Sequence, residues 1–319
     1  MTPCARALLE GIIDYAGLFP PAQLPMDQAF ARFVEHRVSN DGWMLARFVC
    51  PAARLGELEP LLDAARVVPA PFRIAVLGRG GDTLEAFNTA IDRDAEALGD
   101  FVSRRGAGVA VDVFEVRLPA AGGAAVAVER AWRRLTDNGS QVLTPYFEVP
   151  LVGDWRPRLP AAAAAVRDTD RAAGRRHRVG LKIRCGDLDA AAVPEPMAVA
   201  AAIATCRATA VPLKATQGLH HPFRHHDPEL GAPVHGFLNL FTAAILAQVH
   251  DLPVTLLTEI VAETDPAAFA LTENRIGWRD LSADADEVEV ARERLLSSFG
   301  SCSFAEPRDD LRSLELIDP

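Results

Sequence analysis

Short apolar runs alternate with longer segments of helical periodicity along most of this chain, from about residue 43 almost to the C-terminus. This alternation is typical of a parallel sheet, because neighbouring parallel strands are joined by a crossover that usually contains a helix. The runs predict strands over residues 43–50, 72–78, 109–117, 141–148, 179–184, 211–216, 253–259 and 275–280. Eight strands at mostly similar intervals favour a closed (β/α)8 barrel; a doubly wound open parallel sheet is the alternative.

Amphipathic helices are predicted between these strands. Residues 234–249 carry apolar side chains at the i, i+3, i+4 spacing of one buried stripe. Further helices are expected over residues 26–38, 83–101, 124–135, 160–173 and 284–299. We therefore expect a single barrel domain over residues 1–319, with residues 1–40 forming an N-terminal helical cap and residues 300–319 a C-terminal helical tail.

An apolar loop over residues 14–22, with Gly17 and the pair Pro20-Pro21, precedes the helix at 26–38. One interpretation is a rigid plug beneath the barrel. The other is a lid that contributes Asp14 or Tyr15 to the site, since binding residues are often carried on loops.

The net charge of −10 and the pI near 5.3 argue against binding to nucleic acid, which requires clustered Lys and Arg. The N-terminal segment lacks the basic and apolar regions of a signal peptide, and no apolar run is long enough to span a membrane. A cytoplasmic protein is predicted. The five cysteines are scattered, which predicts reduced structural thiols.

Polar side chains collect at the carboxyl ends of the predicted strands, where barrel enzymes place their active sites. They are Arg47, Glu115, Arg117, Tyr146, Glu148, Lys182, Arg184, Lys214, Thr216 and Glu259. Because strand side chains alternate, Lys182 and Arg184 share the inward face while Leu181 and Ile183 face the helices. The alternative is a structural ion network in which Glu115 and Glu148 neutralise the basic residues.

Lys214 ends an apolar run and admits three interpretations. It could be a Schiff-base nucleophile whose pKa is lowered by Lys182 and Arg184. It could be an electrostatic clamp, with Lys182 and Arg184, for a carboxylate or phosphate. It could be an acid/base lysine with histidine partners.

In these residues the sequence resembles the class I aldolases, (β/α)8 barrels whose imine-forming lysine often stands at the end of the sixth strand. In the deoxyribose-phosphate aldolase branch a Lys-x-x-x-Gly turn follows, similar to Lys214–Gly218 here. That branch also carries a second lysine on the seventh strand, where the predicted strands place Thr258 and Glu259. It has a glycine-rich phosphate site after the last two strands, which is not evident in this sequence.

Five of the eight histidines lie within sixteen positions: His220, His221, His225, His226 and His235. One alternative is a metal site, with zinc as the expected ion and His220, His221, His225 and His226 as candidate ligands. The usual His-x-His and His-Glu-x-x-His spacings are absent, however. A proton-transfer or substrate-binding role for His220 or His221 and a surface loop without a specific role are the other interpretations.

Together these observations predict a lyase, aldolase-like or isomerase-like, that acts on a small anionic carbonyl metabolite without a cofactor. The catalytic candidates are Lys214, Glu148, His220 and His221. The substrate-binding candidates are Arg47, Glu115, Tyr146, Lys182, Arg184, Thr216 and His235. The alternatives are a metal-dependent lyase or hydrolase that uses the His220–His235 loop, and a non-catalytic barrel that binds an anion. Barrels of this size often self-associate, so a homo-oligomer is expected, with neither nucleic acid nor membrane as a partner.

Overall fold

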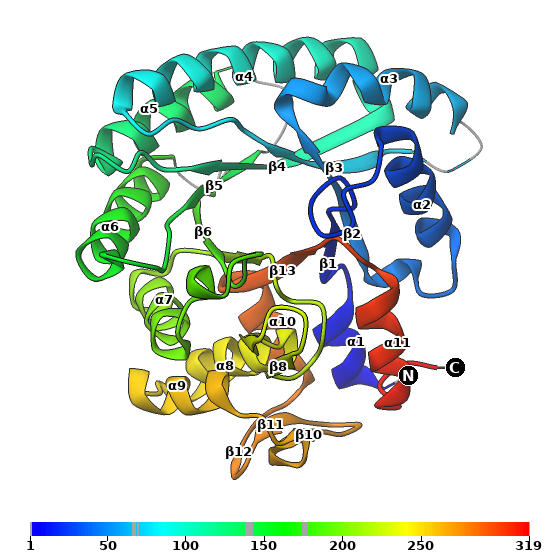
Figure 1. The fold of residues 1–319 in the computed structure, drawn as a ribbon, viewed down its shortest axis with the longest axis vertical. Coiled ribbons are helices and arrows are strands. Elements are labelled where there is room, and N and C mark those ends of the chain that lie inside the picture. Colours follow the sequence, from blue (N-terminus) through cyan, green and yellow to red (C-terminus); the bar gives the residue numbers. More distant parts are fainter. Residues whose placement is uncertain (1, 66–67, 69, 138–142, 174–177, 319) are drawn as a thin grey trace.

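Eight parallel strands close into a barrel in this computed structural model, which describes residues 2–318 except 66–67, 69, 138–142 and 174–177 (Figure 1). The barrel strands are β1 (Ile13–Tyr15), β2 (Leu45–Pro51), β3 (Phe72–Leu77), β4 (Val109–Arg117), β5 (Thr144–Glu148), β6 (Gly180–Arg184), β7 (Leu213–Thr216) and β13 (Leu296–Ser301). They follow one another around the barrel in chain order, and β13 pairs with both β7 and β1. The closure confirms the (β/α)8 barrel and excludes the open sheet.

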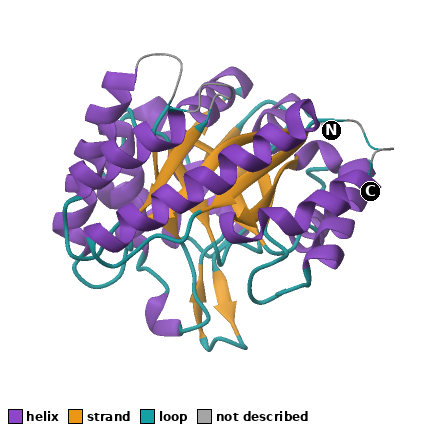
Figure 2. Cartoon of the chain, turned by 90° about the horizontal axis from the view of Figure 1, so that it is seen from above, coloured by secondary structure: helices purple, strands orange, loops and turns teal. Residues whose placement is uncertain are grey.

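Helices surround the strands, as the view in Figure 2 shows. They are α1 (Pro3–Leu9), α2 (Met26–Val38), α3 (Leu55–Ala64), α4 (Leu84–Arg105), α5 (Ala124–Thr136), α6 (Trp155–Ala173), α7 (Pro196–Thr209), α8 (Phe237–His250), α9 (Val254–Ala262), α10 (Ala285–Arg294) and α11 (Ala305–Ser313). Two small antiparallel sheets lie outside the barrel. One pairs β8 (His225–Asp227) with β9 (Ala232–Val234), and the other joins β10 (Phe269–Leu271), β11 (Ile276–Trp278) and β12 (Leu281–Ala283).

Six of the eight predicted strands are confirmed, although residues 141–142 of the predicted fourth strand lie outside the described residues. Two predictions are wrong. Residues 254–259 belong to α9, which follows Pro253 and buries Leu257, Ile260 and Val261 at helical spacing. Residues 275–280 contain β11, which pairs with β10 and β12 instead of joining the barrel.

The two barrel strands that the prediction missed are β1 and β13. β1 has only three residues and lies inside the segment 1–40 that was expected to be a helical cap. The helix predicted over residues 284–299 ends at Arg294, and β13 follows and runs into the segment expected to be a helical tail. Because β1 is the first barrel strand, Lys182 lies on the sixth strand and Lys214 on the seventh.

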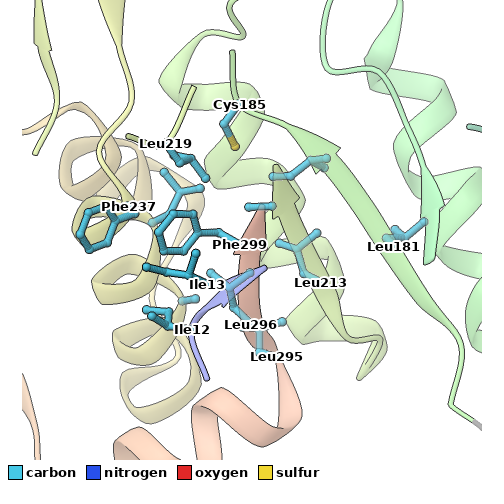
Figure 3. Packing of buried hydrophobic residues seen from close by; sticks show 14 of the residues in the cluster. Ile12, Ile13, Leu181, Cys185, Leu213, Leu219, Phe237, Leu295, Leu296 and Phe299 are labelled. Atoms are coloured by element: carbon cyan, nitrogen blue, oxygen red, sulfur yellow. The ribbon is translucent and has the colours of Figure 1, made fainter. Parts of the chain in front are cut away.

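The main core lies between the barrel and its helices. Phe299 on β13 stacks on Phe237 of α8 with ring centroids 5.0 Å apart, and Ile12, Ile13 and Leu213 lie beside them (Figure 3). A second, smaller apolar cluster takes one residue from each of the four neighbouring strands β2 to β5: Val49, Ala75, Val113 and Tyr146. The ionic groups described next come from β1, β2 and β4 to β7.

Candidate functional site

The sequence of 319 residues contains two lysines among its 33 lysines and arginines, and both lie in the barrel. Lys182 on β6 and Lys214 on β7 are paired directly across the two parallel strands. Both side chains are almost completely buried. At all other lysine or arginine positions the chain has arginine. Lys182 and Lys214 are therefore its only side chains that carry a primary amine.

Lys214 is held by two carboxylates. Its Nζ forms an ion pair with Asp14 on β1 and lies 2.9 Å from Glu115 Oε1 on β4. Ser298 Oγ on β13 donates a hydrogen bond to Asp14 Oδ2 at 2.7 Å. Burial by itself would lower the pKa of Lys214, but Asp14 and Glu115 outweigh it and raise that pKa above its ordinary value. This direction is opposite to the lowering expected from Lys182 and Arg184.

Lys182 has a similar environment on the cavity side. Its Nζ lies 2.8 Å from Glu115 Oε2 and 3.0 Å from Glu148 Oε2, so Glu115 bridges the two lysines. Burial opposes the positive charge of Lys182, but Glu115 and then Glu148 raise its pKa. The same two lysines reverse the effect of burial on Glu115 and lower its pKa. Both amines are therefore protonated in the ligand-free protein at neutral pH.

Arg47 extends this network away from Lys182. Its guanidinium lies 3.2 Å from Asp14 Oδ1 and 2.6 Å from Asp112 Oδ1. The pKa of Asp14 would be raised by burial, but Lys214 and Arg47 lower it to about 2. Asp14, Glu115, Arg47 and the lysines thus form the ion network that was one of the sequence-based alternatives, now with Asp14 as a member.

A cavity of about 300 Å³ opens beside Lys182. Of the predicted site residues, those that line it are Glu115, Glu148, Lys182, Arg184, Thr216 and His220. Lys214, Arg47, Tyr146, His221 and His235 are not among its lining residues. Ala16, Phe19 and Pro20 form part of its wall, so the 14–22 loop borders the cavity and β1 contributes Asp14 to the ion network. Because it follows the end of β1, the loop lies at the carboxyl ends of the strands and not beneath the barrel.

Arg184 lies at the cavity and is the more exposed of the two basic residues that line it. Its guanidinium lies 3.0 Å from an oxygen of Asp187 and also donates to Gln217 Oε1. It does not contact Glu115 or Glu148, in contrast to the predicted ion network. Tyr146, by comparison, packs in the small apolar cluster inside the barrel.

The loop histidines point to different partners. His220 Nδ1 lies 2.9 Å from Glu306 Oε2, and His221 Nδ1 lies 2.7 Å from Asp310 Oδ2; both acids are on α11. His220 lines both the cavity at Lys182 and a neighbouring cavity of about 470 Å³, and His221 and His225 line only the second one.

His235 and His226 line neither of these two cavities. His235 is fully buried, with Nε2 2.8 Å from the carbonyl oxygen of Pro194, and burial lowers its pKa to about 4. His226 is exposed on β8. Within the described part of the chain, no three His, Cys, Asp or Glu side chains are grouped so that they could hold a metal ion.

Ser298 and Cys302 were not predicted as site residues, and Asp14 was predicted only as one possible contribution of the 14–22 loop. Each belongs to or follows a barrel strand that the prediction missed. The signal for β1 is the short run Ile12-Ile13-Asp14-Tyr15, in which an acid interrupts apolar residues. The scarcity of lysine is a second signal, because it isolates Lys182 and Lys214 from all other positions without any structure.

No protein-family model and no curated protein matches the sequence. Among solved structures, the tetrameric deoxyribose phosphate aldolase from Aeropyrum pernix is similar over 98% of this chain and 98% of its own length. The sequence identity is 11% and the TM-score is 0.48. The likeness concerns the fold alone. The functional argument therefore rests on the side chains described above.

Within the described residues, no helix is long and apolar enough to cross a membrane.

Proposed function

We propose that this protein is an aldolase-like lyase that binds a small anionic carbonyl compound as an imine on Lys182. The observation that carries the proposal is the pair of buried lysines on neighbouring strands, of which Lys182 alone lines the cavity. The sequence-based hypothesis centred the reaction on Lys214. Lys214 is 1% exposed and enclosed by Asp14 and Glu115, which favours Lys182 as the reacting amine.

The near-absence of lysine supports amine chemistry over simple charge balance. An arginine could neutralise Glu115 and Glu148 and would bind a carboxylate with two parallel hydrogen bonds. Arginine cannot form an imine, because its guanidinium stays protonated in proteins. A chain that uses arginine at 31 of its 33 lysine and arginine positions yet retains lysine at these two has a requirement that charge alone does not explain.

The resemblance to class I aldolases is also more complete with the observed strand order. Lys182 stands on the sixth barrel strand, where that family often has its imine-forming lysine, and Lys214 stands on the seventh, where the deoxyribose-phosphate aldolase branch has its second lysine. The Lys214–Gly218 turn then follows the seventh strand instead of the sixth. This correspondence supports the assignment of Lys182 to the imine and of Lys214 to a positioning role.

The carboxylates around Lys182 suggest how its amine becomes nucleophilic. Attack on a carbonyl requires the neutral amine, so the ammonium of Lys182 must first lose a proton. Glu148, 3.0 Å away and lining the cavity, is placed to take that proton and later to return it to the leaving hydroxyl as the imine forms. When Lys182 becomes neutral, the ammonium of Lys214 remains paired with Glu115 and keeps this carboxyl group ionised.

The cavity limits the substrate to a small molecule, since about 300 Å³ is at the lower end of the range for ligand sites. Arg184, which also lines the cavity, is the candidate partner for the anionic group of the substrate. The guanidinium of Arg184 would then release Asp187 and bind the substrate anion in its place. The imidazole of His220 lies on the same cavity wall as a second hydrogen-bonding group. A homo-oligomer and a cytoplasmic location remain predictions.

Borohydride trapping tests this proposal directly. The protein is incubated with small aldehydes and keto acids, reduced, and analysed by intact mass and peptide mapping. Only Lys182, Lys214 and the terminal α-amine can form an adduct, so the site is unambiguous. The expected adduct lies on Lys182, is lost in Lys182→Arg, which keeps the positive charge, and persists in the matched variant Lys214→Arg.

Two other outcomes would change the assignment. An adduct on Lys214 that also forms in Lys182→Arg would show that Lys214, on the seventh strand, is the imine-forming residue. If no aldehyde or keto acid is trapped, while anions bind the wild type and Lys182→Arg equally, the protein is an anion-binding barrel without imine chemistry. Isothermal titration with the same keto acids provides that comparison.

A further inference from the structure

Cys302 and His220 line the cavity beside Lys182, and Glu306 contacts the ring of His220. Cys302, directly after β13, has its Sγ 3.8 Å from His220 Nε2 and 3.9 Å from His220 Nδ1. His220 Nδ1 is 2.9 Å from Glu306 Oε2 on α11. Because Glu306 engages Nδ1, Nε2 is the nitrogen left to exchange a proton with the thiol. A base oriented by a third group next to a thiol is the arrangement that activates cysteine nucleophiles.

Cys302 differs from the other cysteines in its access to solvent. Cys4, Cys50, Cys185 and Cys206 are completely buried in the core, whereas Cys302 retains 8% exposure and lines the same cavity as Lys182. Burial raises the pKa of Cys185 and of Cys206 above the range in which a thiol ionises in neutral solution.

We propose that Cys302 is a second reactive group of this cavity, a thiol activated by His220 and Glu306 that adds reversibly to small aldehydes. In the step, His220 Nε2 takes the thiol proton and the thiolate sulfur forms a bond to the carbonyl carbon. The π-electron pair moves to the carbonyl oxygen, which takes the proton back from the His220 imidazolium. The product is a neutral thiohemiacetal, and no oxidant or reductant is consumed. This inference does not depend on imine formation at Lys182.

Charged and titratable groups of neighbouring elements lie around the pair, and His221 also acts on Glu306. Glu306 on α11 stabilises the imidazolium of His220, whose pKa is raised to about 10 because Cys302 and Glu306 together outweigh the effect of burial. Tyr15 on β1 interacts electrostatically with Cys302, and its own pKa is raised, mainly by burial, so it is neutral near pH 7. Arg32 on α2 faces Tyr15 and opposes that rise.

The thiolate–imidazolium pair can be tested with iodoacetamide. The rate of alkylation is measured from pH 5 to pH 9, and the modified residue is identified by peptide mapping. Wild-type protein is expected to react once, at Cys302, and to react readily at pH 6.5, where an ordinary thiol with a pKa of about 8.5 is almost entirely protonated. His220→Gln should slow the reaction at pH 6.5 by at least about tenfold. Glu306→Gln should have a smaller effect in the same direction.

Aldehyde addition is followed with propanal labelled with ¹³C at its carbonyl carbon. The thiohemiacetal carbon resonance should be present with wild type and absent with Cys302→Ser, whereas an imine at Lys182 would persist in both. The site would be refuted by an ordinary pH profile that His220→Gln leaves unchanged, or by a folded protein in which Cys302 does not react. Cys206→Ser is the matched control and should leave alkylation and the resonance unaltered.

Discussion

Replacement of Asp14 by asparagine should reveal how strongly the ion network stabilises the barrel. Asp14 is completely buried, and its pKa is about 2 instead of its ordinary value of 3.8. Each pKa unit corresponds to about 1.4 kcal/mol, so the folded state favours the charged carboxylate by about 2 kcal/mol relative to the unfolded chain. Asp14→Asn should therefore lower the free energy of unfolding at pH 7 by at least about 2 kcal/mol. The loss should approach 3–5 kcal/mol if Lys214 and Arg47 are left poorly compensated.

The pH dependence of this difference gives a second measure. Because the pKa of Asp14 is lower in the folded protein, its stabilisation is complete above the unfolded pKa, near 4, and is lost as the pH falls toward 2. The gap between wild type and Asp14→Asn should shrink by about 1 kcal/mol between pH 7 and pH 3.

Urea unfolding followed by tryptophan fluorescence measures both quantities. The matched control is Asp168→Asn, which removes a carboxylate that is 63% exposed and paired with Arg167. Its effect should stay below about 1 kcal/mol. Equal stability of wild type and Asp14→Asn at pH 7, or a gap that does not change down to pH 3, would show that the network does not stabilise Asp14 as the contacts imply.

Three further substitutions probe single features of the barrel. Ser298→Ala removes the hydrogen bond to Asp14 and should cost about 1.5–3 kcal/mol of unfolding free energy in urea titrations, because the acceptor is charged; no change would mean that the remaining partners suffice. Phe299→Ala empties a fully buried site and should cost about 3–5 kcal/mol, visible as a lower melting temperature in calorimetry; a loss below 1 kcal/mol would contradict the packing described. Gly218→Ala should lower both stability, by about 1–2 kcal/mol, and the yield of the borohydride adduct. Its φ is +73°, and a Cβ would lie 2.7 Å from the Cα of Gly186; unchanged trapping would refute a tight turn beside the site.

The sequence predicted the barrel because most of its strands carry a strong signal. β4 matches the predicted residues 109–117 at both ends, since its nine residues are rich in valine and bounded by glycine and proline turns. The two strands that close the barrel, β1 and β13, have weak sequence signals, each for a different reason. β1 is three residues long, and β13 contains Ser297, Ser298, Gly300 and Ser301, which are not typical strand residues.

Two errors compensated each other in the count. The prediction missed β1 and β13 but counted two other segments as barrel strands, one of which is a helix and the other a strand outside the barrel. The total of eight was therefore right, but β2 to β7 were numbered as the first to sixth barrel strands instead of the second to seventh. The inward direction of Lys182 and Glu115 was predicted correctly, because it depends only on alternation within a strand. The contacts of Lys214 with Asp14 could not be predicted, since they join residues 200 positions apart across a strand that the pattern did not reveal.

The scarcity of lysine also affects how this protein can be handled chemically. Amine-reactive dyes, biotin esters and glutaraldehyde act on exposed lysines, and both lysines here are enclosed in the barrel. Reagents too large for the cavity at Lys182 should label the folded chain only at its terminal α-amine, and amine cross-linking between subunits would report a monomer whatever the assembly in solution. Subunit number is therefore better measured by light scattering or by cross-linking through the abundant surface carboxylates. Conversely, the appearance of lysine labelling during denaturation would report the opening of the barrel itself.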